Sequence, residues 1–349
     1  MYRPLIGIPI GDPAGIGPEI TMKALSNPDI YKICQPLVVG SIDVLKKIAK
    51  ILNSSIIFNE ITHPMEGRYE HGIIDIINCG IVSHGEDAGN IVQELEFGVV
   101  QAEAGRAAFE CIEAVTLLAL RGEVDAIATA PINKEAVRAA KIDFIGHTEM
   151  LESLTGTKDL LTMFQVKTLR VFFLSRHVSL RRACDLITKE RITQYIELCS
   201  NAMKTLGLEN TLLAVAGLNP HNGEHGLFGD EEDLEISPAI EEMKTRGYNI
   251  CGPVPPDSVF HQALQGRFGG VLSLYHDQGH IATKTLDFER TISLTLGMPF
   301  LRTSVDHGTA FDIAGKGIAS GVSMEEAIKV ACEYASIYCS HYLDGLITI

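Results

Sequence analysis

The sequence predicts an α/β protein built on a parallel or mixed β-sheet, and three observations support this. Short apolar runs with the length of buried strands alternate along the 349 residues with stretches of helical periodicity. The first apolar run leads through a glycine-rich turn, residues 11–19, into a helix. Several later runs end abruptly in histidine and other polar residues, at the strand ends where open α/β sheets bind ligands.

The expected elements follow from residue type and spacing. Strands are expected over short apolar runs at residues 5–10, 37–40, 72–78, 125–131, 169–174, 212–218, 271–274 and 291–296. Helices are expected where apolar residues recur at helical spacing, at residues 42–52, 88–121, from 133, 150–154, 188–203, 238–244, 258–264 and 324–343. The last helix is amphipathic, so we expect it to pack on the N-terminal domain. Tandem repeats and low-complexity linkers are absent from the sequence, so a second domain is expected to be interleaved with the first.

Composition excludes several classes of partner. Hydrophobic residues make up 46% of the chain and charged residues 21%, which is ordinary for a globular protein. The 29 basic and 44 acidic side chains give a net charge of −15. Nucleic acids and anionic membranes require clustered lysine and arginine, so neither is expected as a partner. A small anionic substrate remains compatible, because local charge decides its binding.

The sequence also predicts a cytoplasmic location. The apolar run that begins the chain is too short for a signal peptide, and apolar runs of 18 or more residues are absent from the sequence. The eight cysteines are scattered and form no C-x-x-C pair. In a chain of this length they are typical of reduced thiols rather than of a disulfide framework.

The glycine-rich turn reads Gly-Asp-Pro-Ala-Gly-Ile-Gly-Pro-Glu. Pro18 suits the first turn of a helix, and Glu19 complements the positive end of the helix dipole. Such a turn can hold an anion, but its spacing is neither the dinucleotide-binding G-x-G-x-x-G pattern nor a Walker loop. Taken alone, it is explained as a tight turn between strand and helix.

A second candidate for anion binding is Gly146-His147-Thr148-Glu149, before the helix expected at residues 150–154. An imidazole and a hydroxyl at a helix N-terminus can bind phosphate together with the free backbone N–H groups. The alternative is that Thr148 only caps the helix.

Three histidines, His177, His221 and His276, each follow closely on a predicted strand. Three neutral imidazoles suit Zn, Fe, Co or Ni and leave coordination positions open for a substrate. The alternative is a structural role for each of them. Asp257, before the helix at residues 258–264, is either a partner of such a site or a cap of that helix.

Five motifs together resemble the 4-hydroxythreonine-4-phosphate dehydrogenase (PdxA) family. They are residues 11–19, Gly146-His147-Thr148-Glu149, Asn219-Pro220-His221, Tyr275-His276-Asp277-Gln278-Gly279 and Arg302-Thr303-Ser304-Val305-Asp306-His307-Gly308-Thr309-Ala310. The match runs in order from residue 5 to about residue 335. Residues 307–317 also look like the NAD loop of isocitrate and isopropylmalate dehydrogenases.

The resemblance implies a two-domain α/β subunit with an isocitrate/isopropylmalate dehydrogenase-like fold and an interdomain cleft. Residues 1–140 and 285–349 are expected to form the NAD-binding domain, which holds both termini. Residues 141–284 are expected to form the substrate, metal and dimerisation domain. A homodimer is implied, in which the second subunit completes each active site.

The family's functional positions transfer to this chain as follows. One divalent metal ion (Zn, Mg, Mn or Co) is expected on His177, His221 and His276. Substrate binding is expected at His147, Thr148, Lys284, Arg302 and Ser293. At the position of Ser293 the family usually has asparagine. NAD binding is expected at Gly308, Thr309, Ala310, Asp312 and Gly315, and the lack of a compact basic patch favours NAD over NADP. The catalytic candidates are Lys284, Asp257 and Asp277.

The implied reaction is the NAD-dependent oxidation and decarboxylation of a 4-phosphorylated 3-hydroxy acid. Residues 227–232 and His280 look more like the branch acting on 4-phospho-D-threonate or 4-phospho-D-erythronate, which yields dihydroxyacetone phosphate and CO2. The alternative is 4-hydroxy-L-threonine 4-phosphate, the substrate in pyridoxal phosphate biosynthesis. Two other classes stay open: a metal-dependent hydrolase or phosphatase on the same histidines, and a binding module without turnover.

Overall fold

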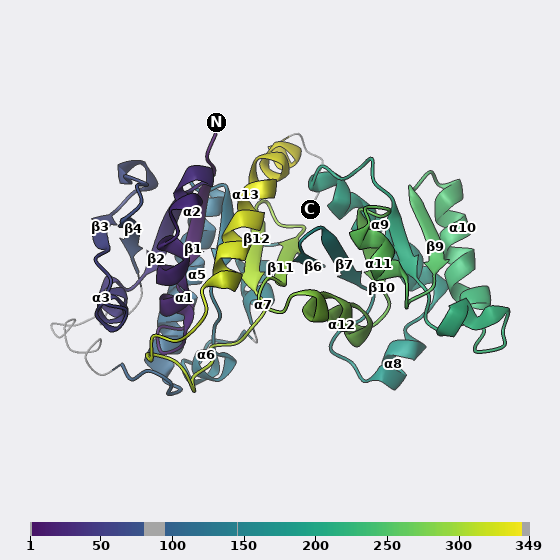
Figure 1. Cartoon of the computed structure of the whole chain (residues 1–349), viewed down its shortest axis with the longest axis horizontal. Helices are drawn as coiled ribbons and strands as arrows, with labels where there is room; N and C mark the ends of the chain where they lie inside the picture. Colours follow the sequence, from purple (N-terminus) through teal and green to yellow (C-terminus); the bar gives the residue numbers. More distant parts are fainter. Residues whose placement is uncertain (1, 80–94, 145, 344–349) are drawn as a thin grey trace. The chain divides into compact units, whose positions relative to one another are not determined.

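The computed structural model describes residues 2–79, 95–144 and 146–343 (Figure 1). The chain divides into two compact units: unit 1 comprises Met1–Leu160 and Met298–Ile349, and unit 2 comprises Leu161–Gly297. The predicted two-domain α/β organisation is thereby confirmed. Over the described ranges, the helices are all too short or too polar to cross a membrane.

Unit 1 is built on a parallel sheet. Its strands are β1 (Leu5–Pro9), β2 (Gln35–Gly40), β3 (Ile57–Ile61), β4 (Ile73–Asn78), β5 (Ala126–Thr129) and β12 (Leu301–Val305). They lie in the order β3-β4-β2-β1-β5-β12, and each pairs in parallel with its neighbour. The carboxyl ends of β1, β5 and β12 therefore meet at one edge of this sheet, which positions the loops that follow them.

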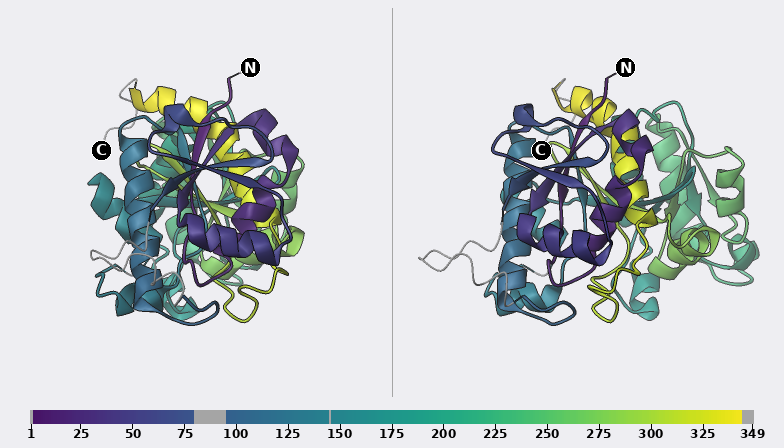
Figure 2. Two further views of the ribbon diagram at one scale, coloured as in Figure 1. Left: turned by 90° about the vertical axis from the view of Figure 1, so that its left-hand side faces the viewer. Right: turned by 60° about the vertical axis from the view of Figure 1, so that its left-hand side comes forward.

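Helices cover both faces of the unit 1 sheet. They are α1 (Gly17–Leu25), α2 (Pro28–Ile33), α3 (Ile42–Ile51), α5 (Ala102–Leu120), α6 (Lys134–Ala139), α7 (His147–Thr155) and α13 (Val322–Leu343), with a short 3₁₀ turn η1 (Pro64–Glu66). Helix α5 lies on one face, and α1 and α13 lie on the other (Figure 2, left). The last helix packs on the strands of this unit, as its amphipathic pattern predicted.

The helix beginnings follow from local sequence. The side chains of Asn27, Ser41 and Asn133 cap α2, α3 and α6 by accepting hydrogen bonds from backbone N–H groups. Helix α5 begins at Ala102 rather than at residue 88, because Gly98 has a left-handed backbone (φ 77°) and Gln101 is extended. Residues 88–94 of that expected helix lie outside the described residues.

Unit 2 is built on a mixed sheet. Its strands are β6 (Leu161–Val166), β7 (Leu169–Phe173), β8 (Leu213–Ala216), β9 (Ile250–Val254), β10 (Gly270–Ser273) and β11 (Ile292–Leu296), in the order β11-β6-β7-β10-β8-β9. Strands β11, β6 and β7 pair antiparallel, and β7, β10, β8 and β9 pair in parallel. The helical segments are α8 (Leu180–Asp185), α9 (Lys189–Thr205), η2 (Pro220–Glu224), η3 (Glu232–Ile236), α10 (Ser237–Thr245), α11 (Val259–Leu264) and α12 (His276–Leu286).

The unit boundaries differ from those expected at 140/141 and 284/285. Helix α7 belongs to unit 1 because its buried Met150 and Leu151 join the core cluster of α5 residues Ile112 and Val115. Strand β11 belongs to unit 2 because it pairs with β6 along its whole length. Boundaries therefore lie where packing changes, up to 20 residues beyond the sequence estimate.

Candidate active site

Two of the three predicted ligand histidines lie close together in unit 2. Strands β7 and β10 are parallel neighbours, so the residues that follow them leave the same edge of the sheet. The rings of His177 and His276 have centroids 6.1 Å apart. Both side chains line a hollow of about 350 Å³ together with Arg176, Tyr275 and Asp277.

His276 begins helix α12, and its ring is oriented by the next residue. Its Nδ1 hydrogen-bonds the Asp277 carboxylate at 2.7 Å, while 41% of the His276 side chain stays exposed. A carboxylate on one ring nitrogen holds the ring and favours the other nitrogen, Nε2, for a ligand or metal. The Asp277 carboxylate thus orients the His276 ring.

His221 lies on a different loop, after β8. Residues 221–225 all have left-handed backbone, with φ between 44° and 73°. This loop lines a separate hollow of about 410 Å³, which also contains Glu224, His225 and Glu232. Among the residues described, three or more His, Cys, Asp or Glu side chains are nowhere close enough together to hold a metal ion. The imidazole donors fit a divalent metal chemically, and the structure brings two of the three together.

His280 packs against His276 from within the unit 2 core. Its ring lies 4.1 Å from the ring of His276, centroid to centroid, and contacts Phe164 and Phe173. Burial, followed by the charges of His276, Lys284 and Arg176, lowers the pKa of His280 to about 4. His280 is therefore a neutral packing residue at physiological pH rather than a charged one.

The other predicted residues of unit 2 are distributed around these loops. Lys284 lies in the last turn of α12, with its Nζ 5.4 Å from the centre of the Phe288 ring. Ser293 lies on β11, where it pairs with Phe164 of β6. Asp257 is exposed before α11, and the N-cap of that helix is Ser258, so the reading of Asp257 as the cap is wrong.

Unit 1 contains the predicted anion site. Arg302 lies on β12 with 5% of its surface exposed, and its Nε and one terminal nitrogen donate to Thr129 Oγ1 at 3.0 and 2.8 Å. Desolvation lowers its pKa to about 9, so the guanidinium remains charged at neutral pH. A cation this deeply buried is costly and is typical of a position that meets an anion.

His147 begins helix α7 and lies within the electrostatic reach of Arg302. Burial and the Arg302 charge lower the pKa of His147 well below its ordinary value, so its ring is neutral. Its Nε2 is buried without a hydrogen-bond partner among the described residues. Gly146 is the N-cap and offers no side chain, so Thr148 lies inside the helix and is not the cap. The backbone N–H groups of His147 and Thr148, at the positive end of α7, can donate to an anion.

The predicted NAD loop follows β12 and packs against the glycine-rich turn. Thr309 is buried, and its carbonyl accepts a hydrogen bond from Ile16 N at 3.0 Å. Ala310 has a left-handed backbone (φ 41°), and Asp312 is exposed. A Cβ at Gly308 would meet nothing within 4 Å, whereas one at Gly315 would touch the Phe97 ring. The backbone at Gly308 is therefore open to a ligand, which suits a cofactor held by main-chain groups.

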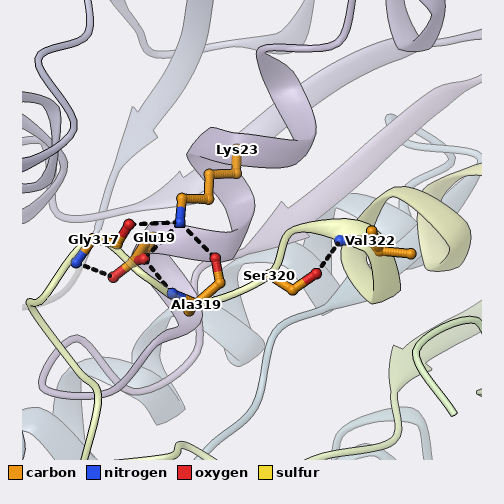
Figure 3. Close-up of polar contacts among 6 residues, drawn as sticks. All are labelled: Glu19, Lys23, Gly317, Ala319, Ser320 and Val322. Carbon is orange, nitrogen blue, oxygen red and sulfur yellow. Dashed lines mark hydrogen bonds and ion pairs between the residues drawn. The ribbon is translucent and has the colours of Figure 1, made fainter.

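An ion pair on α1 anchors the far end of this loop (Figure 3). The fully buried Glu19 accepts hydrogen bonds from Gly317 N at 3.2 Å and Ala319 N at 2.7 Å. Lys23 donates to Glu19 at 2.9 Å and to the carbonyls of Gly317 and Ala319. Glu19 was expected only to complement the helix dipole, and its main contacts are instead with a segment 300 residues away.

Three further residues belong to these sites and were not predicted. Arg176 lines the hollow of His177 and His276. In the sequence, only its position directly before His177 indicated that Arg176 lies at this hollow. Thr129 accepts hydrogen bonds from Arg302, and only its place within the strand predicted at residues 125–131 pointed to it. Asp12 is fully buried in the glycine-rich turn, where Oδ1 accepts from Ala14 N at 2.8 Å and Oδ2 has no partner within the described chain.

The chain is similar to known proteins in family, in sequence and in structure. The family described as "Pyridoxal phosphate biosynthetic protein PdxA" matches residues 32–331. A protein of Symbiobacterium thermophilum named "Putative D-threonate 4-phosphate dehydrogenase" is 57% identical over 96% of this chain and 98% of its own length. A protein of the same name from Clostridium botulinum is 57% identical over 95% and 97%.

Solved structures agree with these sequence matches. A 4-hydroxythreonine-4-phosphate dehydrogenase from Klebsiella pneumoniae superposes with a TM-score of 0.85 at 40% identity, covering 96% of this chain and 98% of that one. One from Burkholderia phymatum superposes with a TM-score of 0.83, also at 40% identity, covering 96% and 99%.

Proposed function

Because this chain belongs to the PdxA family, whose members are dehydrogenases of phosphorylated hydroxy acids, we propose that it oxidises and decarboxylates 4-phospho-D-threonate or 4-phospho-D-erythronate. The observation that carries the proposal is the 57% identity, over nearly the full length, to relatives named "Putative D-threonate 4-phosphate dehydrogenase". The proposed cofactors are NAD and one divalent metal ion. The proposed assembly is a homodimer in which the partner completes each active site.

The reaction balances with NAD as the only oxidant. Oxidation removes a hydride from C3 and a proton from its hydroxyl group, which gives a β-keto acid. The bond between C1 and C2 then breaks, CO2 leaves, and the electron pair remains on C2. Protonation of C2 yields dihydroxyacetone phosphate.

Specific residues are available to hold each group. His177, His221 and His276 are the proposed metal ligands, and the loop with Gly308, Thr309, Ala310, Asp312 and Gly315 is the proposed NAD site. When bound, NAD accepts the hydride, and the metal ion draws electron density from the substrate oxygens.

The remaining steps belong to side chains of this chain. Arg302, His147, Thr148 and the N-terminus of α7 bind the phosphate, because a buried guanidinium, a neutral imidazole and free N–H groups all suit an anion. Ser293 contacts the polar groups of the substrate.

Proton transfer is assigned to the charged residues of unit 2. Asp277 holds the His276 ring through its 2.7 Å hydrogen bond. Lys284 binds the carboxylate and transfers a proton at C2, and Asp257 and Asp277 are the further candidates for the base that takes the hydroxyl proton.

A substrate panel tests the proposal. The purified protein is given NAD, a divalent metal and one of 4-phospho-D-threonate, 4-phospho-D-erythronate or 4-hydroxy-L-threonine 4-phosphate. The expected result is NADH and dihydroxyacetone phosphate in equal amounts from the first two acids, with loss of activity on chelation and recovery when metal is returned. Preferred turnover of the hydroxythreonine phosphate would move the chain to the vitamin branch. Release of inorganic phosphate without NADH would make it a hydrolase.

A further inference from the structure

Lys134 lies beside the start of helix α7, where the phosphate of the substrate is proposed to bind. Gly146 is the N-cap of that helix, and a Cβ placed on it would lie 3.6 Å from Lys134 Cε. The ammonium group is one bond beyond Cε. It can therefore reach an anion that the backbone N–H groups of His147 and Thr148 bind.

The position of Lys134 is fixed by packing within unit 1. Helix α6 begins at Lys134, directly after the cap Asn133, whose side chain accepts from Ala136 N at 2.9 Å. A Cβ at Gly105 of α5 would clash with the Ala136 carbonyl, so α5 and α6 are in close contact. Val137 of α6 belongs to the same core cluster as residues of α5 and α7. Helix α5 thus holds the starts of α6 and α7 side by side, independently of any contact made by the lysine.

The charges around Lys134 leave an excess of positive potential. Lys134 is the first residue of its own helix and lies next to the start of α7, and the helix dipole disfavours a cation at both places. Arg302 adds a buried guanidinium whose charge acts on His147. Over the described ranges of the chain, the Lys134 ammonium has no carboxylate or other hydrogen-bond partner. A bound anion would be stabilised by all of these positive groups at once.

From this arrangement we propose that Lys134 is a further substrate-binding residue, whose ammonium donates to the phosphate from the solvent side. Arg302 and the start of α7 bind the same phosphate from the buried side. The inference rests on the proposed function and deepens it by adding a residue to the phosphate site.

The chemistry of the phosphate and of the lysine fits this role. A phosphate monoester carries about two negative charges at neutral pH, more than one guanidinium neutralises. Lys134 is exposed, and its flexible stem lets the ammonium move aside when substrate enters and product leaves. The buried Arg302 is held by Thr129 and lacks that freedom.

Binding measurements test the inference without any turnover. The affinities of the full-length protein for inorganic phosphate and for 4-phospho-D-erythronate are measured by isothermal titration calorimetry in the absence of NAD. Lys134→Met keeps the length of the stem and removes the charge, so both ligands are expected to bind about 10-fold more weakly. Lys134→Arg should stay within about threefold of the wild type, because it keeps a charged donor. The difference between wild type and Lys134→Met should shrink as salt is raised to about 1 M, which screens an exposed charge.

Kinetics and stability separate a binding role from a structural one. In Lys134→Met the KM for the phosphorylated acid is expected to rise by the same factor, while kcat and the KM for NAD stay unchanged. The urea midpoint of the ligand-free variant is expected at or above that of the wild type, because a cation has been removed from two helix starts. Lys141→Met, at an exposed lysine just after the other end of α6, is the matched control and should bind both ligands with wild-type affinity.

Each other outcome has a separate meaning. If Lys134→Met binds both ligands as tightly as the wild type does, the inference is overturned and the proposed function stands. A rise in the KM for NAD alone would place Lys134 at the cofactor and overturn it as well. If Lys134→Met loses affinity for inorganic phosphate but the wild type forms NADH from none of the phosphorylated acids, the inference stands and the proposed function falls. If the wild type binds neither ligand, both fall. Lys134→Gln is judged by the same criteria if Lys134→Met does not fold.

Discussion

Arg302 carries a desolvation cost that a bound anion would offset. It lies on β12, whose five residues are all buried, and 5% of its surface is exposed. Burial lowers its pKa to about 9, and its charge contributes to keeping His147 neutral. A guanidinium and a neutral imidazole in each other's electrostatic reach could both donate to an anion.

Substitution of Arg302 tests this assignment. Arg302→Lys keeps the charge but loses the planar set of donors, so the KM for the phosphorylated acid is expected to rise about 10- to 100-fold, as expected from hydrogen bonds to charged groups worth about 1.5–3 kcal/mol. The KM for NAD should change little. Steady-state kinetics with each substrate varied in turn measure both values.

The control is Arg290→Lys, an exposed arginine that pairs with Asp287 at 3.1 Å. It should leave both KM values unchanged. A normal KM for the phosphorylated acid in Arg302→Lys would remove Arg302 from the substrate site.

At the scale of elements, helix α1 controls the loop after β12. The Glu19–Lys23 pair makes four hydrogen bonds to the backbone of Gly317 and Ala319 (Figure 3). This loop begins at the end of β12 and contains all five predicted NAD residues. The helix thus holds the end of the loop at a fixed position relative to the sheet.

Substitution of Glu19 should therefore affect the cofactor more than the substrate. Glu19→Gln places an amide donor against backbone donors and leaves Lys23 without its carboxylate, so the KM for NAD is expected to rise on the order of 10-fold through misplacement of the loop. The KM for the phosphorylated acid should change much less. Asp29→Asn is the control, because Asp29 pairs with Lys32 on an exposed face of α2. Equal effects on both KM values would show that Glu19 stabilises unit 1 in general.

Sequence analysis placed strands best where the chain has a mainly apolar run. Strands β1, β2, β7 and β10 were expected within one or two residues of their observed ends. Strand β12 was not, because Arg302-Thr303-Ser304 is a polar run whose burial depends on partners such as Thr129. Helix α12 was not expected either, since its sequence begins with polar and glycine residues. A buried segment can be recognised from the sequence only where its buried side chains are apolar.

The candidate site was also predictable only in part. Parallel pairing of β7 and β10 brings His177 and His276 together, as reasoning from strand ends predicted. The place of His221 depends on five successive left-handed residues, a conformation that non-glycine residues rarely adopt and that sequence patterns do not indicate. The buried hydrogen bond from the Gln278 side chain to the Gly217 carbonyl was equally invisible, because these residues lie 61 positions apart in the sequence.

At the scale of the whole molecule, stability depends on pH through Asp12. Burial raises the pKa of its carboxyl group from 3.8 to about 6. The folded chain therefore holds this proton more tightly than the unfolded chain does. The resulting stabilisation is fully present below about pH 3.8 and is lost as the pH rises through about 6.

Asp12→Asn should remove this dependence. The amide keeps the acceptor for Ala14 N and carries no charge, which favours the variant at neutral pH by about 3 kcal/mol, at about 1.4 kcal/mol per pH unit. Its NH2 group takes the place of the unpartnered Oδ2 and costs about 1–3 kcal/mol, so the variant is expected to range from as stable as the wild type to about 2 kcal/mol more stable. Urea unfolding between pH 4 and pH 7 measures the change. Asp43→Asn, at an exposed position on α3, should leave the pH profile as in the wild type. A wild-type profile in Asp12→Asn would show that the carboxyl stays ionised in the fold.

The division into units also has a consequence for the order of synthesis. Unit 2 is one continuous segment, inserted between two parts of unit 1. The ribosome therefore completes unit 2 while β12 and α13, with Met298 and Phe300 of the unit 1 core, are still to be made. At about 5–20 residues per second, the rest of the chain takes a few seconds more. During that interval β5 lacks its β12 partner, so the first-made half of the protein is the last to finish folding.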